Sequence, residues 1–153
     1  MPKIPKKYEI LTEQFKDFRH PKNPNKIVRV YRIIALMEIA TTQGNILKGE
    51  IGGFVAGEHN LSHSGNCWIK NTAKVFDDGQ VIDDTLLTDQ ASVYQHAIVS
   101  NSIISGYAQV YGQTKIVDSD IRDKCDVRFR YGTPEKIGGW KQLGESNLTR
   151  ARS

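Results

Sequence analysis

Small and aliphatic residues alternate with other residues in a short, fixed pattern over the middle of the chain. From Cys67 to Val127 a small residue, any residue and an aliphatic residue follow one another eleven times, at steps of five or six positions. The small and the aliphatic residue are two positions apart, so in an extended segment both point to the same side. A helical stripe would instead recur at three and four positions. The pattern therefore predicts short strands stacked into a solenoid.

The aliphatic positions also recur at a longer interval of seventeen or eighteen residues. Three such strands make one coil of about eighteen residues, so residues at that interval should lie above one another. Small residues are expected at the corners, because three faces converge there and leave little space. We therefore predict an all-β fold, a short parallel β-helix of about three and a half coils. Its inward ladders are Ile69, Leu87, Ile104 and Ile121; Val75, Val93, Val110 and Val127; and Val81, Val99 and Ile116.

The spacing within the repeat resembles that of a known family. Val75 is followed four positions later by Gly79, as in the hexapeptide-repeat, left-handed parallel β-helix family. This resemblance implies the left hand of the coil, which periodicity does not give. The Gly-Gly-Phe-Val segment at 52–55 and the Gly-Asn-Cys-Trp segment at 65–68 further resemble a group of phage and prophage proteins of this fold. Members of that group are often labelled transferases without evidence of activity.

The chain outside the repeats divides into two parts. We predict an N-terminal arm and β-rich cap at 1–60, the β-helix at 61–131, and an irregular C-terminal tail at 132–153. Within the arm, prolines and charges indicate an extended segment with a short helix near Glu13–Phe18. The β-rich run Ile27–Ile39 is expected to form one or two strands. It should cover the N-terminal end of the β-helix, because an uncovered first coil would expose unpaired backbone groups.

Residues that flank the buried aliphatic positions should point outward and form ladders of their own. A contiguous exposed apolar patch is typical of a contact surface. The N-terminal segment or the tail could fold back over one face, but so little chain should not cover all three. At least one face should therefore bind another protein or another copy of the chain. The interface candidates are Phe76, Tyr94, Tyr111 and Arg128 on one face, Trp68, Leu86 and Ile103 on another, and Ile82, Ile98 and Val117 on the third.

The net charge of +4 is unevenly distributed along the chain. Residues 1–35 carry nine basic and three acidic side chains, whereas residues 73–123 carry three basic and eight acidic ones. Most of these acidic residues fall at predicted corners, where Asp suits the turn geometry. The basic ends could attract nucleic acid, but a protein partner is the favoured prediction.

Two further features bear on compartment and cofactors. The sequence has no apolar run near eighteen residues and no apolar stretch after its first basic residues, which predicts a cytoplasmic protein. The resemblance to phage and prophage proteins implies the cytoplasm of a bacterial host. Cys67 and Cys125 occupy inward small positions on different faces, so both are predicted to be reduced core residues. The sequence lacks a phosphate-binding loop and a metal-ligand spacing, and we expect neither a cofactor nor a metal site.

Histidines are the residues to consider for catalysis, because the resembled family includes coenzyme A-dependent acyltransferases in which a histidine is the general base. The four histidines are His20 in the arm, His59 and His63 before the first repeat, and His96 at a corner. We expect His96 to be exposed and His63 to make a structural hydrogen bond. No catalytic residue is therefore predicted.

The combined prediction is a non-enzymatic protein-binding module that is phage-encoded and acts on a bacterial host protein, such as a defence system component. A homo-oligomer, a dimer or a trimer, is expected to form through one of the outward ladders. Two other interpretations stay open: a coenzyme A-dependent acyltransferase of the hexapeptide-repeat class, and a virion or assembly component.

Overall fold

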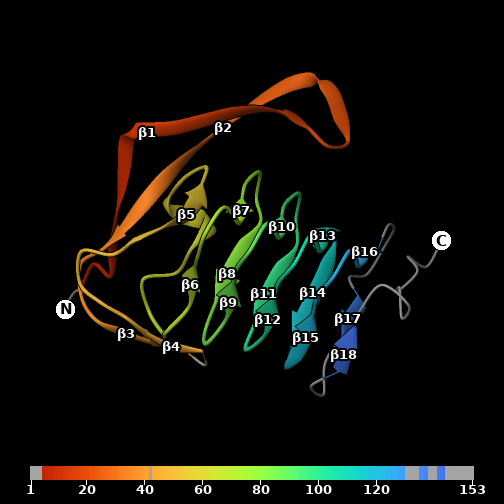
Figure 1. Ribbon diagram of the computed structural model, residues 1–153. Coiled ribbons are helices and arrows are strands. Elements are labelled where there is room, and N and C mark those ends of the chain that lie inside the picture. The colour runs from red at the N-terminus through yellow and green to blue at the C-terminus, as the bar shows by residue number, and fades with distance from the viewer. Residues whose placement is uncertain (1–4, 42, 130–134, 138–140, 144–153) are drawn as a thin grey trace.

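The computed structural model describes residues 5–41, 43–129, 135–137 and 141–143. It shows a short stack of coils with a long two-stranded hairpin arching over one side (Figure 1). The strands of successive coils pair in parallel and form three faces, each of which is one sheet. The prediction of an all-β fold with a short parallel β-helix is therefore confirmed.

Each face of the β-helix takes one strand from successive coils. The first face contains β5 (Ile51–Val55), β7 (Lys74–Val75), β10 (Ser92–Val93), β13 (Gln109–Gly112) and β16 (Asp126–Phe129). The second face contains β8 (Gln80–Ile82), β11 (Ile98–Ser100), β14 (Thr114–Val117) and β17 (Glu135–Ile137). The third face contains β6 (Trp68–Ile69), β9 (Leu86–Leu87), β12 (Ile103–Ile104), β15 (Ser119–Ile121) and β18 (Lys141–Leu143). A 3-10 turn, η1 (Glu58–Asn60), follows β5.

The strand register confirms the three predicted inward ladders. Val93, for example, pairs with Val75 on one side and with Val110 on the other. Val99 likewise lies between Val81 and Ile116. The ladder residues from β6 to β16 are completely buried, and each such side chain contributes about 1.5–3 kcal/mol to stability. The core is therefore one continuous column of aliphatic side chains.

The β-helix is longer at both ends than the predicted range 61–131. At the start, β5 pairs in parallel with β7, so the first face begins at Ile51 and adds Val55 to a ladder. At the end, the predicted irregular tail contributes β17 and β18, which pair with β14 and β15. In the C-terminal addition, Glu135 and Lys141 stand where the repeat has a small residue, whereas Gly53 keeps that residue before Val55.

The N-terminal segment forms an antiparallel hairpin of β1 (Tyr8–His20) and β2 (Asn23–Ala35), which we call the arm. The predicted helix near Glu13–Phe18 is therefore wrong. Side chains alternate there: Phe18 and His20 face the β-helix, whereas Phe15 is exposed, and that period of two suits a strand. The strand β2 also pairs with β5. This pairing confirms that the β-rich run covers the N-terminal edge of the first face.

The predicted exposure of the first outward ladder is wrong. Phe76 and Tyr94 are completely buried, and Tyr111 is 5% exposed. The inner side of the arm covers them, with Val28 and Val30 in the same apolar cluster. The backbone of Arg128 continues this ladder by pairing with Tyr111, while its side chain lies outside the described residues. The alternative that the N-terminal segment folds back over one face is thus the one that the structure shows.

The second outward ladder is also largely covered. Trp68 and Leu86 are buried, and Ile103 is half-buried. A small hairpin of β3 (Ile39–Thr41) and β4 (Gly44–Ile46) adds its apolar residues to the cluster that contains Trp68 and Leu86. Trp68 and Leu86 are therefore part of the core of the described chain, which leaves Ile103 as the partly exposed member of this ladder.

The second face carries the remaining apolar positions, Ile82, Ile98 and Val117, all of which are half-buried. They do not form the single ladder that was predicted. Ile98 lies between Gln80 and Lys115, whereas Ile82 is in line with Val117 through a serine of β11. The register therefore breaks this apolar surface into two mixed columns.

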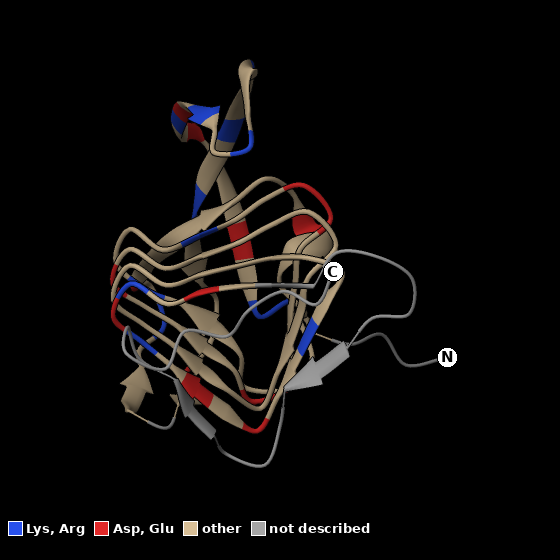
Figure 2. Ribbon diagram, turned by 90° about the vertical axis from the view of Figure 1, so that its right-hand side faces the viewer, with Lys and Arg blue, Asp and Glu red and all other residues tan. Residues whose placement is uncertain are grey.

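The corners confirm the interpretation of the acidic residues. Eight described non-glycine residues, most of them Asp or Asn, have φ between 50° and 62°. Asp and Asn tolerate this left-handed region better than other side-chain-bearing residues. Acidic residues accordingly gather at the corners of the coils (Figure 2). Cys67 and Cys125 are both buried in the core, as predicted.

Candidate binding site at the arm tip

The arm rests on a stack of aromatic rings. Phe76 and Tyr94 have parallel rings with centroids 4.8 Å apart, and the rings of Tyr94 and Tyr111 stack at 5.0 Å. These distances match the spacing of neighbouring strands, about 4.8 Å. Phe18 of β1 meets the Phe76 ring edge-on at 5.0 Å. Aromatic pairs in these geometries add to the gain from burial, so the stack fixes the arm along the β-helix.

His20, the last residue of β1, attaches the tip of the arm to a corner of the coil. Its Nε2 lies 2.7 Å from Oδ2 of Asp77, and its Nδ1 accepts a hydrogen bond from the backbone N–H of Lys22 at 3.0 Å. Because Nδ1 is an acceptor, Nε2 carries the proton and donates it to the carboxylate. The side chains of His20 and Asp77 are only 5% and 15% exposed, so this bond is shielded from water.

Asp77 receives three donors from three parts of the chain. Besides His20, the backbone N–H of Gln95 donates to Oδ2 at 3.2 Å, and Nζ of Lys26 lies 3.4 Å from Oδ1. Burial raises the pKa of this carboxyl, but the hydrogen bonds from His20 and Gln95 and the charge of Lys26 outweigh burial, so its pKa lies below the ordinary value. Asp77 is therefore an ionised anchor for the arm.

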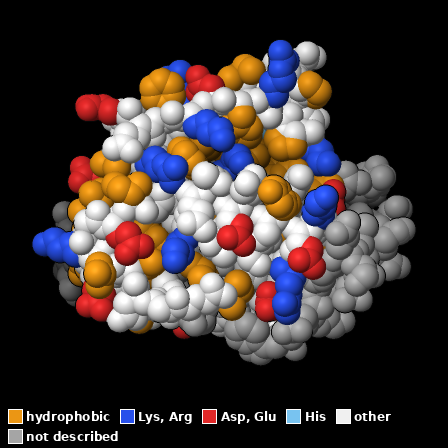
Figure 3. All heavy atoms as spheres, in the orientation of Figure 1, with side chains coloured by type: hydrophobic (Ala, Val, Ile, Leu, Met, Phe, Trp, Pro, Cys, Tyr) orange, Lys and Arg blue, Asp and Glu red, His pale blue; other side chains and the backbone are white. Residues whose placement is uncertain are grey.

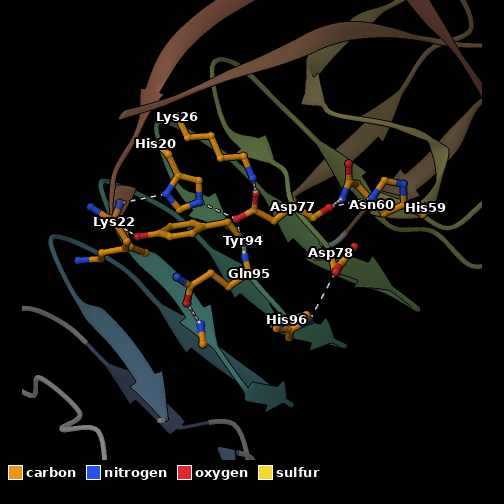
Figure 4. Close-up of polar contacts among 12 residues, drawn as sticks. His20, Lys22, Lys26, His59, Asn60, Asp77, Asp78, Tyr94, Gln95 and His96 are labelled. Atoms are coloured by element: carbon orange, nitrogen blue, oxygen red, sulfur yellow. Dashed lines mark hydrogen bonds and ion pairs between the residues drawn. The ribbon is translucent and has the colours of Figure 1, made fainter. Parts of the chain in front are cut away.

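A cavity of about 720 Å³ opens beside this junction. Figure 4 shows the side chains around it converging from the arm tip, from the turn before the first repeat and from two successive corners. The lining residues are His20, Lys22, Asn23, Lys26, His59, Asp77, Asp78, Gln95 and His96. Nitrogen-containing side chains dominate this list. The cavity can therefore offer several hydrogen-bond donors to a ligand.

Three lining side chains have nitrogen atoms that could still bond to a ligand. The ammonium of Lys22 lies 4.5 Å from the centre of the Tyr111 ring, and among the described residues no carboxylate is paired with it. His59 donates a hydrogen bond from Nε2 to the carbonyl of Asp77 at 2.8 Å, so its Nδ1 is the ring nitrogen that could contact a ligand. His96 has Nδ1 at 3.6 Å from Asp78, and both side chains are about two-thirds exposed.

The other histidines are committed to structural contacts. His63 accepts a hydrogen bond at Nδ1 from the backbone N–H of Lys7, bonds Glu58 through Nε2 at 2.9 Å, and stacks on Tyr8 at 4.2 Å. The predicted structural role of His63 and the predicted exposure of His96 are both confirmed. His20 and His63 have both ring nitrogens engaged, so neither can accept a substrate proton without first losing a bond.

Two of the interface residues predicted from the sequence lie next to the cavity. Tyr94 and Tyr111 lie beneath the arm beside the cavity instead of facing a partner. The pairing of His20 with Asp77 was not predicted, because the two residues are 57 positions apart. The local signal for His20 is the two-residue alternation of β1, which places His20 on the same side of the strand as Phe18. That signal requires the segment to be recognised as a strand first.

No model of a known protein family matches this chain, and a search of curated proteins finds no match. The described part of the chain contains no helix that is long and apolar enough to cross a membrane. Within the same residues, no three His, Cys, Asp or Glu side chains are placed to hold a metal ion. Functional inference therefore rests on the fold and on the geometry of the arm.

Proposed function

We propose that this chain is a non-enzymatic protein-binding module whose recognition element is the arm. The observation that supports this proposal is the outer face of the arm, where Phe15 is 49% exposed and Ile27 is 59% exposed. Hydrophobic and basic side chains gather along the arm in the space-filling view (Figure 3). Because the inner face is fixed by the aromatic stack and by Asp77, the outer face is preorganised, which lowers the entropic cost of binding.

The outer face has the composition of a binding hot spot. Arginine and aromatic residues dominate such sites. The guanidinium of Arg29 lies 4.0 Å from the centre of the Phe15 ring and donates two hydrogen bonds to Asp17, at 2.8 and 2.9 Å. Three cross-strand pairs make up this face: Phe15 with Tyr31, Asp17 with Arg29, and Arg19 with Ile27.

These contacts favour a protein partner over a nucleic acid. Single-stranded nucleic acids bind by stacking bases on free aromatic faces, but Arg29 covers one face of Phe15 and Tyr31 meets its edge. Asp17 also places a carboxylate in the middle of the patch, where it would repel phosphates. A bacterial host protein in the cytoplasm, such as a defence component, is the proposed partner. A homo-oligomer through the second face, with Ile98 in the contact, is a compatible proposal that light scattering can test.

The proposal can be tested with a matched pair of variants. Ile27→Asp changes the outer face, whereas Leu47→Asp changes a residue of the same exposure, 60%, away from the arm. A partner isolated with the wild-type chain, once purified, should bind Ile27→Asp at least about tenfold more weakly. Leu47→Asp should bind within about twofold. Equal binding of both variants would show that the arm is not the recognition element.

The acyltransferase alternative has its own test. Calorimetric titration with acetyl-coenzyme A should give no saturable heat under our proposal. Saturable binding, with acyl transfer that is lost in a His96→Gln variant, would replace the protein-binding proposal with the enzymatic one.

A further inference from the structure

We infer that the cavity at the arm tip binds an oxyanion, a phosphate or a carboxylate group, through Lys22, His59 and His96. This inference goes beyond the proposed function, because the cavity lies at the junction of arm and coil and not on the outer face of the arm. It rests on which charges around the cavity are already paired and which are not.

The carboxylate of Asp77 does not oppose an incoming anion strongly. It accepts hydrogen bonds from His20 and Gln95, and Lys26 lies 3.4 Å away as its counterion. An anion in the cavity therefore meets a carboxylate whose charge is compensated by fixed donors. Asp78 is the other acidic residue of the lining; it is 70% exposed, so water screens its charge.

Lys22 is the strongest candidate for the contact. Its ammonium is held over the Tyr111 ring, with the ring centre 4.5 Å away, and no described carboxylate is paired with it. The N–H donors of the ammonium that point away from the ring are left to water or a ligand. Lys22 can therefore bind an oxyanion without first breaking an ion pair.

The charge of the cavity depends on its imidazoles. The charged and titratable groups that face it are Lys22, Lys26, His20, His59, His96, Asp77 and Asp78. With neutral imidazoles the two lysines and the two aspartates balance, 2 − 2 = 0. A proton on His59 and another on His96 would give the cavity two positive charges and two further donors. Protonation of either imidazole should therefore strengthen anion binding.

The test uses inorganic phosphate, acetate and the peptide acetyl-Glu-Glu-Glu-amide as probes, with the full chain at constant ionic strength. Imidazole resonances in NMR spectra report on His59 and His96 directly. We expect saturable shifts of these two histidines. For acetate and the peptide, whose carboxylates stay ionised over this range, the dissociation constant should be at least about threefold lower at pH 6 than at pH 8. His63, which lies outside the cavity and has both nitrogens engaged, should not shift in a saturable way.

Two variants make the result specific. Lys22→Ala should raise the dissociation constant at least about fivefold, while Lys16→Ala, the same loss of charge on the arm but outside the cavity, should change it less than about twofold. Shifts with phosphate and the acidic probes would support a general oxyanion site, and shifts with acetate and peptide alone would support a carboxylate site. Equal effects of both variants, or no saturable shift with any probe, would overturn the inference. Neither Ile27 nor Leu47 lines the cavity, so this result and the test of the proposed function are independent.

Discussion

At the corner between β7 and β8, the left-handed backbone and the side chain of Asp77 serve different purposes. The φ of 54° makes the corner possible, and the carboxylate then binds His20, Gln95 and Lys26. The neighbouring Asp78 has a side chain that is 70% exposed. Two adjacent residues of the same type therefore differ in role, because the arm and the next corner supply donors to only one of them.

The substitution Asp77→Asn should lower the free energy of unfolding by about 1–3 kcal/mol at pH 7, because it removes a buried charge-assisted network. Asn tolerates the same φ, so the corner itself is kept. The pKa of Asp77 lies below its unfolded value, so the stability that it contributes is present at neutral pH and is lost as the pH falls through the folded pKa.

Urea unfolding at several pH values checks this prediction, with Asp78→Asn as the control. The control should stay within about 0.5 kcal/mol of the wild type. The difference between the two variants should shrink below about pH 4, where carboxylates in the unfolded chain become protonated. A constant difference down to acidic pH would contradict the role given to the charge.

The arm shows how a two-residue period assigns opposite roles to neighbouring side chains. Phe18 packs on Phe76, whereas Phe15, three residues earlier, is 49% exposed on the other side. The two positions belong to the same strand and carry the same residue type. The two side chains contribute differently to stability because Phe18 packs against the β-helix and Phe15 lies against solvent.

Phe18→Ala should destabilise the arm by about 2–4 kcal/mol, because Phe18 is one of the side chains that cover the aromatic stack. Phe15→Ala should cost less than about 1 kcal/mol, because its ring loses mainly the contact with Arg29. Hydrogen exchange of β1 amides is the direct measurement, since loosening of the arm should speed exchange there before it does so in the coils. Equal protection in the two variants would show that the arm is not held by its inner face.

The whole molecule is a column in which each coil contacts only its neighbours. Such an arrangement has stability that depends on unbroken stacking from one end to the other. The arm packs on the first face and the β3–β4 hairpin packs on the third face. Together they bury apolar side chains on the outside of the short stack. The second face has no such cover among the described residues.

A pair of adjacent substitutions in β11 tests this architecture. Val99→Asp would bury an unpaired carboxylate in the column at a cost of several kcal/mol and should abolish soluble folding. Ile98→Asp, on the outside of the same strand, should leave a folded protein with a melting temperature within about 5 °C of the wild type. Circular dichroism of the purified variants decides between them, and a folded Val99→Asp protein would show that the register is wrong.

The repeat determined the fold by itself because its energetics are local. A small residue followed two positions later by an aliphatic one needs an extended strand, and a recurrence of seventeen or eighteen residues places Val75, Val93 and Val110 above one another. Each side chain is buried by neighbours of the same pattern, so periodicity alone gives the inward ladders. The left-handed corners with Asp and Asn follow from the same local geometry.

The tertiary structure alone decided which outward residues are exposed and where the candidate site lies. Phe76 and Tyr94 look exposed in the repeat because nothing local says that a segment some sixty residues earlier will cover them. His20 meets Asp77 only because the arm turns at Lys22 and runs along the first face. A two-residue period predicts on which side of a strand a residue lies. Which segment packs against that side depends on contacts between residues far apart in the sequence. The cavity, formed by four segments that are far apart in the chain, could therefore not be predicted from the sequence.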